Sequence, residues 1–409
     1  MNTLLSLGNL YLSDFVQNNE QPRSGKHELK LILDENIQAP RLADPPDIHK
    51  MYGKYWYRSG VNQTMKNELK EIVDSILKIK NLQEKDIWID IASNDGTLLS
   101  FLPDTLIKIG IDPADDSYRV EAEQYADLII QDFFSSSLYK QSKFGHTKAK
   151  IITCIAMFYD IDKPDQFLNE VAEILDDDGI FVLQLSYTPL MIEQCAFDNI
   201  CHEHIWYYSL FNIKKLLENC GFQVFNCELN DVNGGSFRVY ATLNKQKISN
   251  ILSQQYIDVS NFRIKSILEY EKTLNLNSNE TWNIFFQNIE QLKNETFQFI
   301  SSEKAKGKKI WAYGASTKGN TLLQYFGLDH SLIDGIADRS EYKWGLKTVG
   351  TNIPIYSESE MRKQHPDYLL VLPWHFINEF IKREHDYLKN DGVFIVPCPK
   401  FKLIKYGKN

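Results

Sequence analysis

The sequence has little cysteine, and its six cysteines show no C-x-x-C spacing. So few do not predict a disulfide framework, and they are typical of free thiols in a reducing compartment. No apolar run approaches the roughly 20 residues of a membrane span. The first residues lack the basic region and the cleavage site of a secretory signal. These absences predict a cytoplasmic protein.

An excess of basic residues is also absent, since the net charge is −9. This balance argues against a broad nucleic-acid surface and favours a small-molecule partner. Hydrophobic residues make up 43% and charged residues 24% of the chain, as in folded globular proteins. At 409 residues the chain is too long for one ordinary core, so two or three domains are expected. The oligomeric state is left open.

Strand-like runs alternate with helical periodicity in two parts of the chain, which predicts α/β architecture with doubly wound, mostly parallel sheets. Residues 65–79 carry apolar side chains at three- and four-residue spacing, and residues 164–179 are expected to form a helix that ends at a glycine. The expected parts are an irregular N-terminal segment (1–56), a central domain (57–245), a helical connector (246–305) and a C-terminal α/β domain (306–409).

The loop after the first strand of the central domain carries acids and one glycine. That loop runs from Asp90 to Gly96, which allows a tight turn towards a ligand, and Asp112 ends the next strand. A carboxylate at the position of Asp112 can accept both ribose hydroxyls of a nucleoside. Ala92 and Asn94 stand where the pyrophosphate-binding G-x-G-x-x-G pattern has glycine, so an NAD site is not indicated.

A loop that holds a ribose and carries acids, without cradling phosphates, suits S-adenosylmethionine (SAM). Asp90 and Asp95 would help to solvate its cationic sulfonium and amino-acid end, and Asp132 after the third strand would approach the adenine. The alternative interpretation is a turn that only caps a helix.

Seven stretches follow one another in an order that resembles a known family. They are YRSGVNQTM (57–65), IDIASNDGTLL (89–99), GIDP (110–113), AMFYDI (156–161), FDNICHEHIWYYSL (197–210), NGGSFRVY (233–240) and GASTKGNTLLQYF (314–326). Together they resemble the SAM-dependent sugar C-methyltransferases, which act on nucleotide-linked keto-deoxysugars. The resemblance extends over about residues 5–398.

The resemblance implies a small zinc-binding N-terminal domain, a central class I SAM-methyltransferase domain and a Rossmann-like C-terminal domain that helps to hold the nucleotide sugar. SLGNLYLSDF (6–15) resembles the segment after the family's first pair of zinc cysteines, but neither cysteine pair is present. His27 and His49 alone cannot make a four-ligand site. We therefore expect SAM as cofactor and no zinc.

Residues 201–204 read Cys-His-Glu-His, and the residues alone leave three interpretations open. A metal site would need further ligands, which nothing in the sequence suggests. In a core, the histidines would satisfy buried hydrogen bonds. In an acid/base site, a histidine would remove a proton while a carboxylate orients its ring and stabilises its charged form.

In the family this stretch is usually Tyr-His-Glu-His. The resemblance assigns active-site roles to Glu203 and His204, with His204 as the general base polarised by Glu203. The candidate catalytic set is His204, Glu203, Cys201 and His202, in which His202 matches the motif in a structural role. Cys201 replaces the tyrosine, and a thiol is a weaker hydrogen-bond donor with less reach than a phenol.

Other positions take their roles from the resemblance or from their neighbours. Lys318 at a helix N-terminus would favour a nucleotide diphosphate, and Trp374 would stack on the ligand beside His375. The expected cofactor-binding residues are Tyr57, Ser59, Gly60, Asn62, Asp90, Ala92, Asn94, Asp95, Gly96, Asp112, Asp132 and Met157. The expected substrate-binding residues are Tyr207 and Tyr208, one of which would replace the missing tyrosine, with Asn233, Gly234, Lys318, Trp374 and His375.

The expected function is transfer of a methyl group from SAM to a carbon of a nucleotide-linked deoxysugar, for a surface polysaccharide or a secondary metabolite. Because Cys201 departs from the family, an O- or N-methyltransferase of the same fold, acting on a sugar or another small metabolite, is the first alternative. A non-catalytic protein that binds SAM or a sugar nucleotide is the second. The sugar, the nucleotide and the methylated atom are not identified by the sequence.

Overall fold

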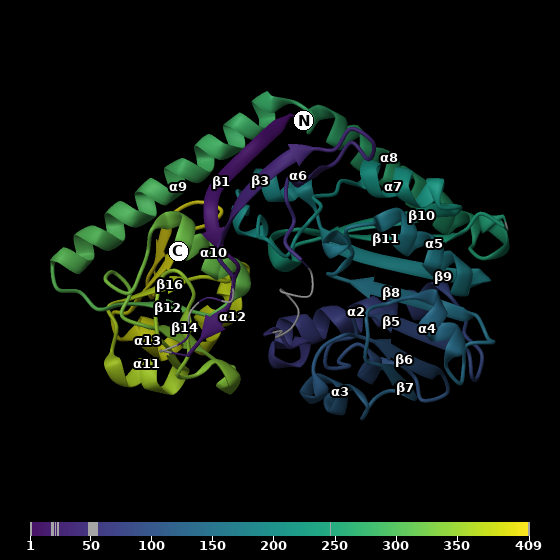
Figure 1. Cartoon of the computed structure of the whole chain (residues 1–409), viewed down its shortest axis with the longest axis horizontal. Helices are drawn as coiled ribbons and strands as arrows, with labels where there is room; N and C mark the ends of the chain where they lie inside the picture. The colour runs from purple at the N-terminus through teal and green to yellow at the C-terminus, as the bar shows by residue number, and fades with distance from the viewer. Residues whose placement is uncertain are drawn as a thin grey trace.

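The computed structural model describes residues 2–17, 20, 22, 24–47, 56–245 and 247–407. Two large sheets lie at opposite sides of the molecule, and two long helices run above them (Figure 1). These helices are α8 (Gln254–Leu274) and α9 (Asn279–Ala305). They occupy the stretch in which the sequence predicts helices, between the two α/β parts.

The central sheet has seven strands in the order β10-β11-β9-β8-β5-β6-β7. Only β11 runs antiparallel to its neighbours, and the strand order reverses between β5 and β8. Ligands of such sheets bind beyond the carboxyl ends of the strands at that reversal. The strands are β5 (Ile87–Ile91), β6 (Ile107–Ile111), β7 (Leu128–Ile130), β8 (Ala149–Ile155), β9 (Leu175–Ser186), β10 (Phe222–Asn230) and β11 (Ser236–Leu243).

Short and medium helices flank this sheet. The predicted helix at 65–79 is present as α2, whose apolar positions are buried and whose first turn is capped by the Asn62 side chain. The helices are α2 (Gln63–Ile79), α3 (Asp116–Ala122), α4 (Ser136–Gln141), α5 (Pro164–Ile174), α6 (Thr188–Glu193) and α7 (Leu210–Asn219).

The prediction of a helix up to residue 179 was wrong. The helix α5 ends at Ile174, and Leu175 already begins β9. Lysines from neighbouring elements bind the three aspartates that follow: Lys150 contacts Asp176 and Asp178, and Lys245 contacts Asp177. Tertiary contacts therefore override the local helical pattern.

The C-terminal sheet has six strands in the order β15-β13-β12-β16-β17-β18, and β18 alone is antiparallel to its neighbour. Its strands are β12 (Ile310–Tyr313), β13 (Ile336–Asp338), β15 (Ile355–Ser357), β16 (Tyr368–Val371), β17 (Val393–Val396) and β18 (Lys402–Ile404). The helices are α10 (Thr317–Phe326), α11 (Glu358–Gln364), α12 (Ile377–Arg383) and α13 (His385–Lys389).

The N-terminal residues form a sheet, which corrects the prediction of an irregular segment. The strands β1 (Thr3–Tyr11), β3 (Lys26–Leu33) and β4 (Pro40–Leu42) are antiparallel. The pair β2 (Phe15–Val16) and β14 (Lys347–Thr348) joins this segment to the C-terminal part. Leucines of β1 and β3 pack in one core with the C-terminal domain, which stabilises the extended conformation.

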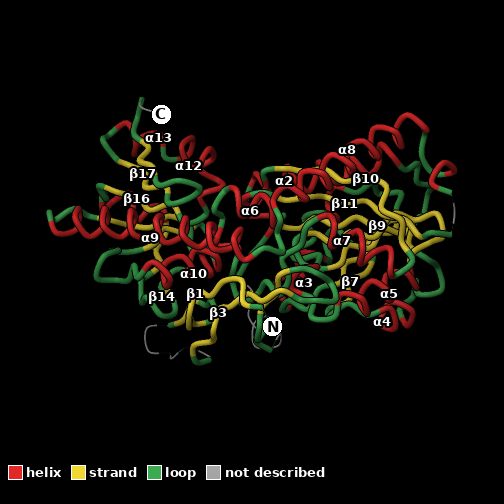
Figure 2. The backbone as a smooth tube through the Cα atoms, turned by 90° about the horizontal axis from the view of Figure 1, so that it is seen from above, coloured by secondary structure: helices red, strands yellow, loops and turns green. Residues whose placement is uncertain are grey.

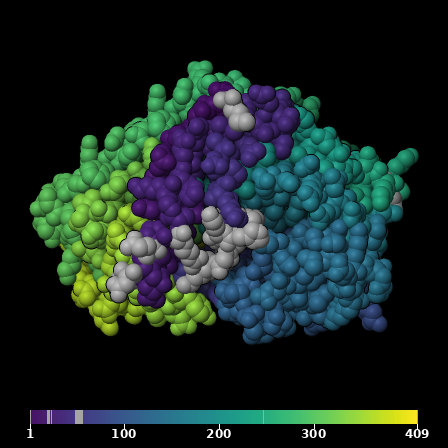
Figure 3. All heavy atoms as spheres, in the orientation of Figure 1, coloured from purple at the N-terminus to yellow at the C-terminus, as the bar shows by residue number. Residues whose placement is uncertain are grey.

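The N-terminal sheet lies across the boundary between the two α/β parts. Figure 3 shows these residues in purple over the junction between the C-terminal and the central elements. Seen from above, β1 and β3 lie between the two large sheets (Figure 2). On the central side, Arg41 in β4 pairs with Trp206. We propose the four predicted ranges as domains.

Within the described residues, no helix combines the length and the apolar character needed to cross a membrane.

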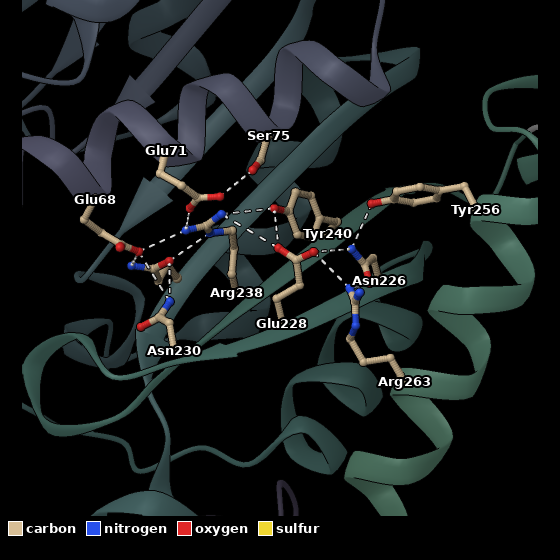
Figure 4. Close-up of polar contacts among 11 residues, drawn as sticks. Glu68, Glu71, Ser75, Asn226, Glu228, Asn230, Arg238, Tyr240, Tyr256 and Arg263 are labelled. Atoms are coloured by element: carbon tan, nitrogen blue, oxygen red, sulfur yellow. Dashed lines mark hydrogen bonds and ion pairs between the residues drawn. The ribbon is translucent and has the colours of Figure 1, made fainter.

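A polar network fixes α2 to the central sheet (Figure 4). Arg238 on β11 is almost completely buried, and its guanidinium contacts Glu68 at 2.9 Å and Glu71 at 2.5 Å, both on α2. Arg238 also donates to the side-chain oxygen of Gln184 at 2.9 Å. Because α2 carries Met65 and Leu69 into a cavity described below, Arg238 fixes one wall of that cavity.

Replacing Arg238 with methionine is expected to destabilise the fold. The change leaves buried acceptors without their cation, which costs about 3 kcal/mol. Arg263→Met is the matched control, because Arg263 is partly exposed and also binds a glutamate, Glu228. The control should cost less than about 1 kcal/mol. Urea unfolding curves measure both, and equal losses would contradict the importance of Arg238.

Candidate functional site

A cavity of about 1560 Å³, including its open mouth, lies at the carboxyl ends of β5, β6 and β8. We call it the central cavity. It lies where the strand order reverses, the usual ligand position in such sheets. The predicted site residues on its wall are Tyr57, Ser59, Asp90, Ala92, Asn94, Asp112, Met157, Glu203, His204, Asn233 and Lys318.

The loop after β5 is held in a strained conformation. Ala92 and Asn94 have φ angles of 61° and 53°, and Ala156 at the end of β8 has a φ of 55°. Left-handed backbone is unfavourable for alanine and persists where the surroundings enforce it, often at functional sites. Both alanines line the central cavity.

Asp112 holds this loop from the end of β6. Its two carboxylate oxygens accept hydrogen bonds from the backbone N–H groups of Asn94 and Ala114, each at 2.8 Å. Each oxygen keeps a further lone pair, because a carboxylate can accept about four hydrogen bonds. Asp112 thus has acceptor capacity for the two ribose hydroxyls of a nucleoside.

The segment before α2 is fastened to the same loop. The backbone N–H of Ser59 donates to the side-chain oxygen of Asn94 at 3.0 Å, and that of Gly60 donates to Asp95 at 2.8 Å. The Asn94 amide donates in turn to the carbonyl of Tyr57 at 3.0 Å. Tyr57 and Ser59 therefore reach the cavity wall.

Gly60, Asp95 and Asn62 do not line the central cavity, which differs from the prediction. The backbone N–H of Gly60 and the carboxylate of Asp95 bind each other, and Asp95 also accepts from the hydroxyl of Thr97 at 2.6 Å. Asn62 caps α2 by accepting from the N–H of Thr64.

Gly96 and Asp132 were also placed wrongly by the sequence. A side chain at Gly96 would meet the backbone of Ala122 at 2.7 Å, so this glycine serves the close approach of α3 and not of a ligand. Asp132 is exposed and accepts from the N–H of Phe133. The aromatic residues Phe133 and Phe134 line the cavity at this end in its place.

Asp90 is a buried acid on the floor of the central cavity. Burial raises its pKa to about 7, the charge of Asp112 adds to this, and a 2.6 Å hydrogen bond from the Thr153 hydroxyl opposes it. A cationic ligand group beside Asp90 would favour its ionised form. The residues present therefore fit the sulfonium end of SAM, with Asp112 available for its ribose.

The Cys-His-Glu-His stretch divides into two parts. Glu203 and His204 line the central cavity, whereas Cys201 and His202 do not. The Cys201 thiol is buried, which raises its pKa. His202 Nε2 is bonded to the backbone carbonyl of His27 at 3.2 Å, and burial lowers its pKa to about 4. Both residues are structural here, which corrects their assignment to the catalytic set.

His204 is oriented by a backbone carbonyl. Its Nδ1 lies 2.8 Å from the carbonyl oxygen of Asn199, so Nδ1 carries the proton and Nε2 is the unprotonated nitrogen. Burial lowers the pKa of His204 to about 3, and the nearby charge of Lys318 adds to this. The prediction that Glu203 orients His204 was wrong, because Asn199 occupies that position.

Glu203 is an acid that titrates near neutrality. Burial raises its pKa to about 7, while a hydrogen bond with Thr317 and the charge of Lys318 act in the opposite direction. A group with a pKa near the working pH suits acid/base chemistry. Thr317 is a residue that the sequence argument missed, although it stands beside Lys318.

Tyr207 and Tyr208 lie in the core and not on the cavity wall. Tyr208 stacks on Phe158 with ring centres 5.7 Å apart, and both tyrosines are at most 5% exposed. The cavity instead presents Tyr159, whose ring centre lies 4.2 Å from that of His204. Tyr159 follows β8 in the AMFYDI stretch. Its position just after a strand was the only sign in the sequence that it could line the site.

Trp374, His375 and Gly234 also lie outside the cavity wall. The indole N–H of Trp374 donates to the carboxylate of Asp198 at 3.2 Å, and a side chain at Gly234 would meet Trp374 at 3.1 Å. Burial lowers the pKa of His375 to about 3. Trp374, which was predicted to stack on the ligand, thus packs between the domains. Of Asn233 and Gly234, only Asn233 reaches the central cavity.

A second cavity of about 890 Å³ lies at the carboxyl ends of β12 and β13. Gly314 to Thr317 and Asp338 line it, together with the cationic side chains of Arg339, Lys343 and Arg383. Asp338 accepts from the N–H groups of Ala315 at 2.7 Å and Ser340 at 2.8 Å, the arrangement that Asp112 shows in the central domain.

Lys318 lies apart from the rest of its loop. It lines the central cavity and not the second one, because its ammonium donates to the Asn199 side chain at 2.5 Å. The sequence analysis predicted that Lys318 and the glycine turn bind the same nucleotide diphosphate. That prediction was wrong, because the two line different cavities.

Among the described residues, no group of three or more histidine, cysteine, aspartate or glutamate side chains is arranged to hold a metal ion. His49 lies outside the described residues. The expected absence of zinc stays a prediction.

Two family models match this chain. Residues 61–226 match a family model described as a methyltransferase domain, and residues 231–399 match one described as a C-methyltransferase C-terminal domain. The C-methyltransferase NovU of Streptomyces niveus is 27% identical over 360 residues, which cover 88% of this chain and 83% of NovU. The chain is an enzyme of the SAM-dependent methyltransferase class, and the predicted class I methyltransferase fold is confirmed.

Solved methyltransferase structures resemble part of this chain. One is the complex of the Haloferax volcanii Trm112 methyltransferase activator with a putative methyltransferase, at 15% identity and a TM-score of 0.37, covering 45% of this chain and 94% of that one. Another is the magnesium protoporphyrin IX methyltransferase ChlM of Synechocystis PCC 6803 with bound SAH, at 14% identity and a TM-score of 0.35, covering 46% and 90%.

The affinity for SAM is expected to depend on pH through Asp90. As pH rises from 6 to 8, a carboxyl with a pKa of about 7 becomes ionised, so the cation should bind up to about tenfold more tightly. Asp90→Asn stays neutral and should lose this component of the pH dependence. Calorimetric titration with SAM measures both proteins, and parallel pH profiles would contradict a contact with Asp90.

Proposed function

We propose that this methyltransferase methylates a carbon next to the carbonyl group of a nucleotide-linked keto-deoxysugar, and that it does so in the cytoplasm. The observation that carries the proposal is the central cavity, whose wall contains both the Asp90–Asp112 loop and the His204 imidazole. A methyl donor and a proton acceptor can therefore share one enclosed space.

SAM, when bound, supplies a methyl group on a cationic sulfur. In the proposal, Asp112 accepts hydrogen bonds from its ribose and Asp90 faces its cationic end. The apolar wall near Phe134 and Met157 keeps water from the transfer site.

His204 is proposed to remove the proton from the acceptor carbon. The bond from Nδ1 to the Asn199 carbonyl leaves Nε2 unprotonated, and the lowered pKa keeps the ring neutral at neutral pH. Such a ring is a weak base, so the imidazolium that forms needs a nearby negative charge. The ionised form of Glu203, on the same cavity wall, supplies that charge.

The second cavity is proposed to hold the nucleotide of the acceptor. Its cationic lining suits a diphosphate, and Asp338 offers the same acceptor geometry as Asp112. Thr317 lines both cavities, so a sugar nucleotide that spans them would place its sugar near His204. This proposal extends the family's chemistry to a particular substrate class.

The acceptor class is tested with purified enzyme, labelled SAM and a panel of nucleotide sugars with and without a keto group. We expect C-methylated product from keto-deoxysugars only, identified by mass spectrometry and NMR. His204→Ala should lower kcat at least about 100-fold, while calorimetry shows unchanged affinity for SAM. Methylation of sugars without a carbonyl would contradict the substrate class, and full turnover by His204→Ala would exclude His204 as the base.

The rate is expected to rise with pH through about 7. His204 is already neutral well below this pH, so the rising limb belongs to the ionisation of Glu203, whose raised pKa is about 7. In Glu203→Gln the profile of kcat between about pH 5.5 and 8.5, measured with SAM saturating at every pH so that its pH-dependent binding does not contribute, should be flat and lower than that of the wild type. A rising limb that persists in Glu203→Gln would assign it to another group.

A further inference from the structure

A half-buried lysine from the C-terminal domain enters the catalytic cavity of the central domain. Lys318 is the second residue of α10, and its ammonium donates to the Asn199 side-chain oxygen at 2.5 Å. It shares the central cavity with Glu203 and His204. The catalytic space is therefore complete only when both domains contribute to it.

One residue fixes both Lys318 and His204. The backbone carbonyl of Asn199 holds His204 Nδ1 at 2.8 Å, and its side-chain oxygen holds the Lys318 ammonium. Asn199 is only 2% exposed, and its own amide donates to the carbonyl of Ala196 at 3.1 Å. The base and the cation thus keep a fixed position relative to each other.

The surroundings of Lys318 place acids around an ammonium that has donors to spare. Burial lowers its pKa, and the charges of Asp198, Glu203 and Asp160 oppose that shift. Of its three N–H donors, one is directed at Asn199. Two donors remain for an oxygen atom in the cavity.

We propose that Lys318 is a catalytic residue that stabilises the enolate oxygen of the acceptor, with Asn199 as its positioning residue. This inference rests on the proposed function. As His204 Nε2 takes the proton, the C–H electron pair becomes part of a C=C bond and the carbonyl π pair moves to the oxygen that Lys318 faces. When the oxygen pair returns, the carbonyl re-forms and the C=C π pair bonds the carbon to the methyl group of SAM. The bond between that methyl group and sulfur breaks, and its electron pair stays on the sulfur of the S-adenosylhomocysteine that leaves. The proton on His204 then passes to solvent.

The position of Lys318 distinguishes this role from phosphate binding. The other cationic side chains described above line the second cavity, whereas Lys318 lies with the proton acceptor. A donor aimed at the site where negative charge develops acts on the transition state more than on the bound substrate. Loss of Lys318 should therefore lower kcat and leave the acceptor KM nearly unchanged.

The test measures deuterium exchange at the acceptor carbon in D₂O without SAM, followed by methyl transfer with SAM. Lys318→Met should slow both about 100- to 1,000-fold, as for the loss of one oxyanion donor, with the acceptor KM and the SAM affinity within about threefold. Lys318→Arg should recover part of the exchange rate. Lys108→Met is the matched control: Lys108 is a buried lysine, bonded to Asp104 outside both cavities, and should change neither rate.

Asn199→Ala provides a second variant in case Lys318→Met does not fold. It removes the side-chain oxygen that holds Lys318 and keeps the backbone carbonyl that holds His204. The exchange rate should fall about tenfold, which corresponds to about 1.4 kcal/mol in activation free energy, and the acceptor KM should not change.

Two results would overturn the role of Lys318 while the proposed function stands. One is exchange by Lys318→Met within threefold of the wild type. The other is a higher acceptor KM with an unchanged kcat, which would mark a substrate-binding lysine. If the wild type neither exchanges nor methylates any keto sugar, the proposed function fails and the inference falls with it.

Discussion

The site depends on an ammonium group held between the central and the C-terminal sheet, with acids around it. A buried charge is costly unless it is paired and hydrogen-bonded. Asn199 supplies the hydrogen bond, and Asp198 is among the acids that compensate the charge. Because these partners belong to the central domain and Lys318 to the C-terminal one, their contacts help to hold the two domains together at the central cavity.

The two domains use the same local solution around their cavities. In each domain, an aspartate at the end of the second strand accepts two backbone N–H hydrogen bonds, one from the loop after the first strand and one from the residue two positions after the aspartate. Asp112 accepts from Asn94 and Ala114. Asp338 accepts from Ala315 and Ser340. This bonding fixes a glycine-poor loop without a bound ligand. The cavities differ in the charge of their linings, which is acidic near Asp90 and cationic near Arg339.

The sequence predicted most of what depends on local pattern. The two doubly wound sheets, α2 and the cavity position of Asp112 follow from periodicity and from acids placed after strands, whereas the choice of His204 came from the resemblance to the family. Contacts between distant segments escaped it: Asn199 and Lys318 are 119 residues apart, and nothing local marks their bond. The N-terminal sheet was missed for the same reason, since its leucines are buried against other domains. Trp374 was predicted to be an exposed aromatic residue, because its hydrogen bond to the distant Asp198 has no local signal in the sequence.

The strands near the N-terminus limit how the molecule can exchange its ligands. These strands pair with β14 of the C-terminal domain and with Trp206 of the central domain. A hinge motion that separates the two domains would therefore break backbone pairing with at least one of the domains. We therefore expect entry and departure through the cavity mouth, past Tyr57, which is 41% exposed. Small side-chain and loop movements, faster than the opening of whole domains, would then set the pace of product release.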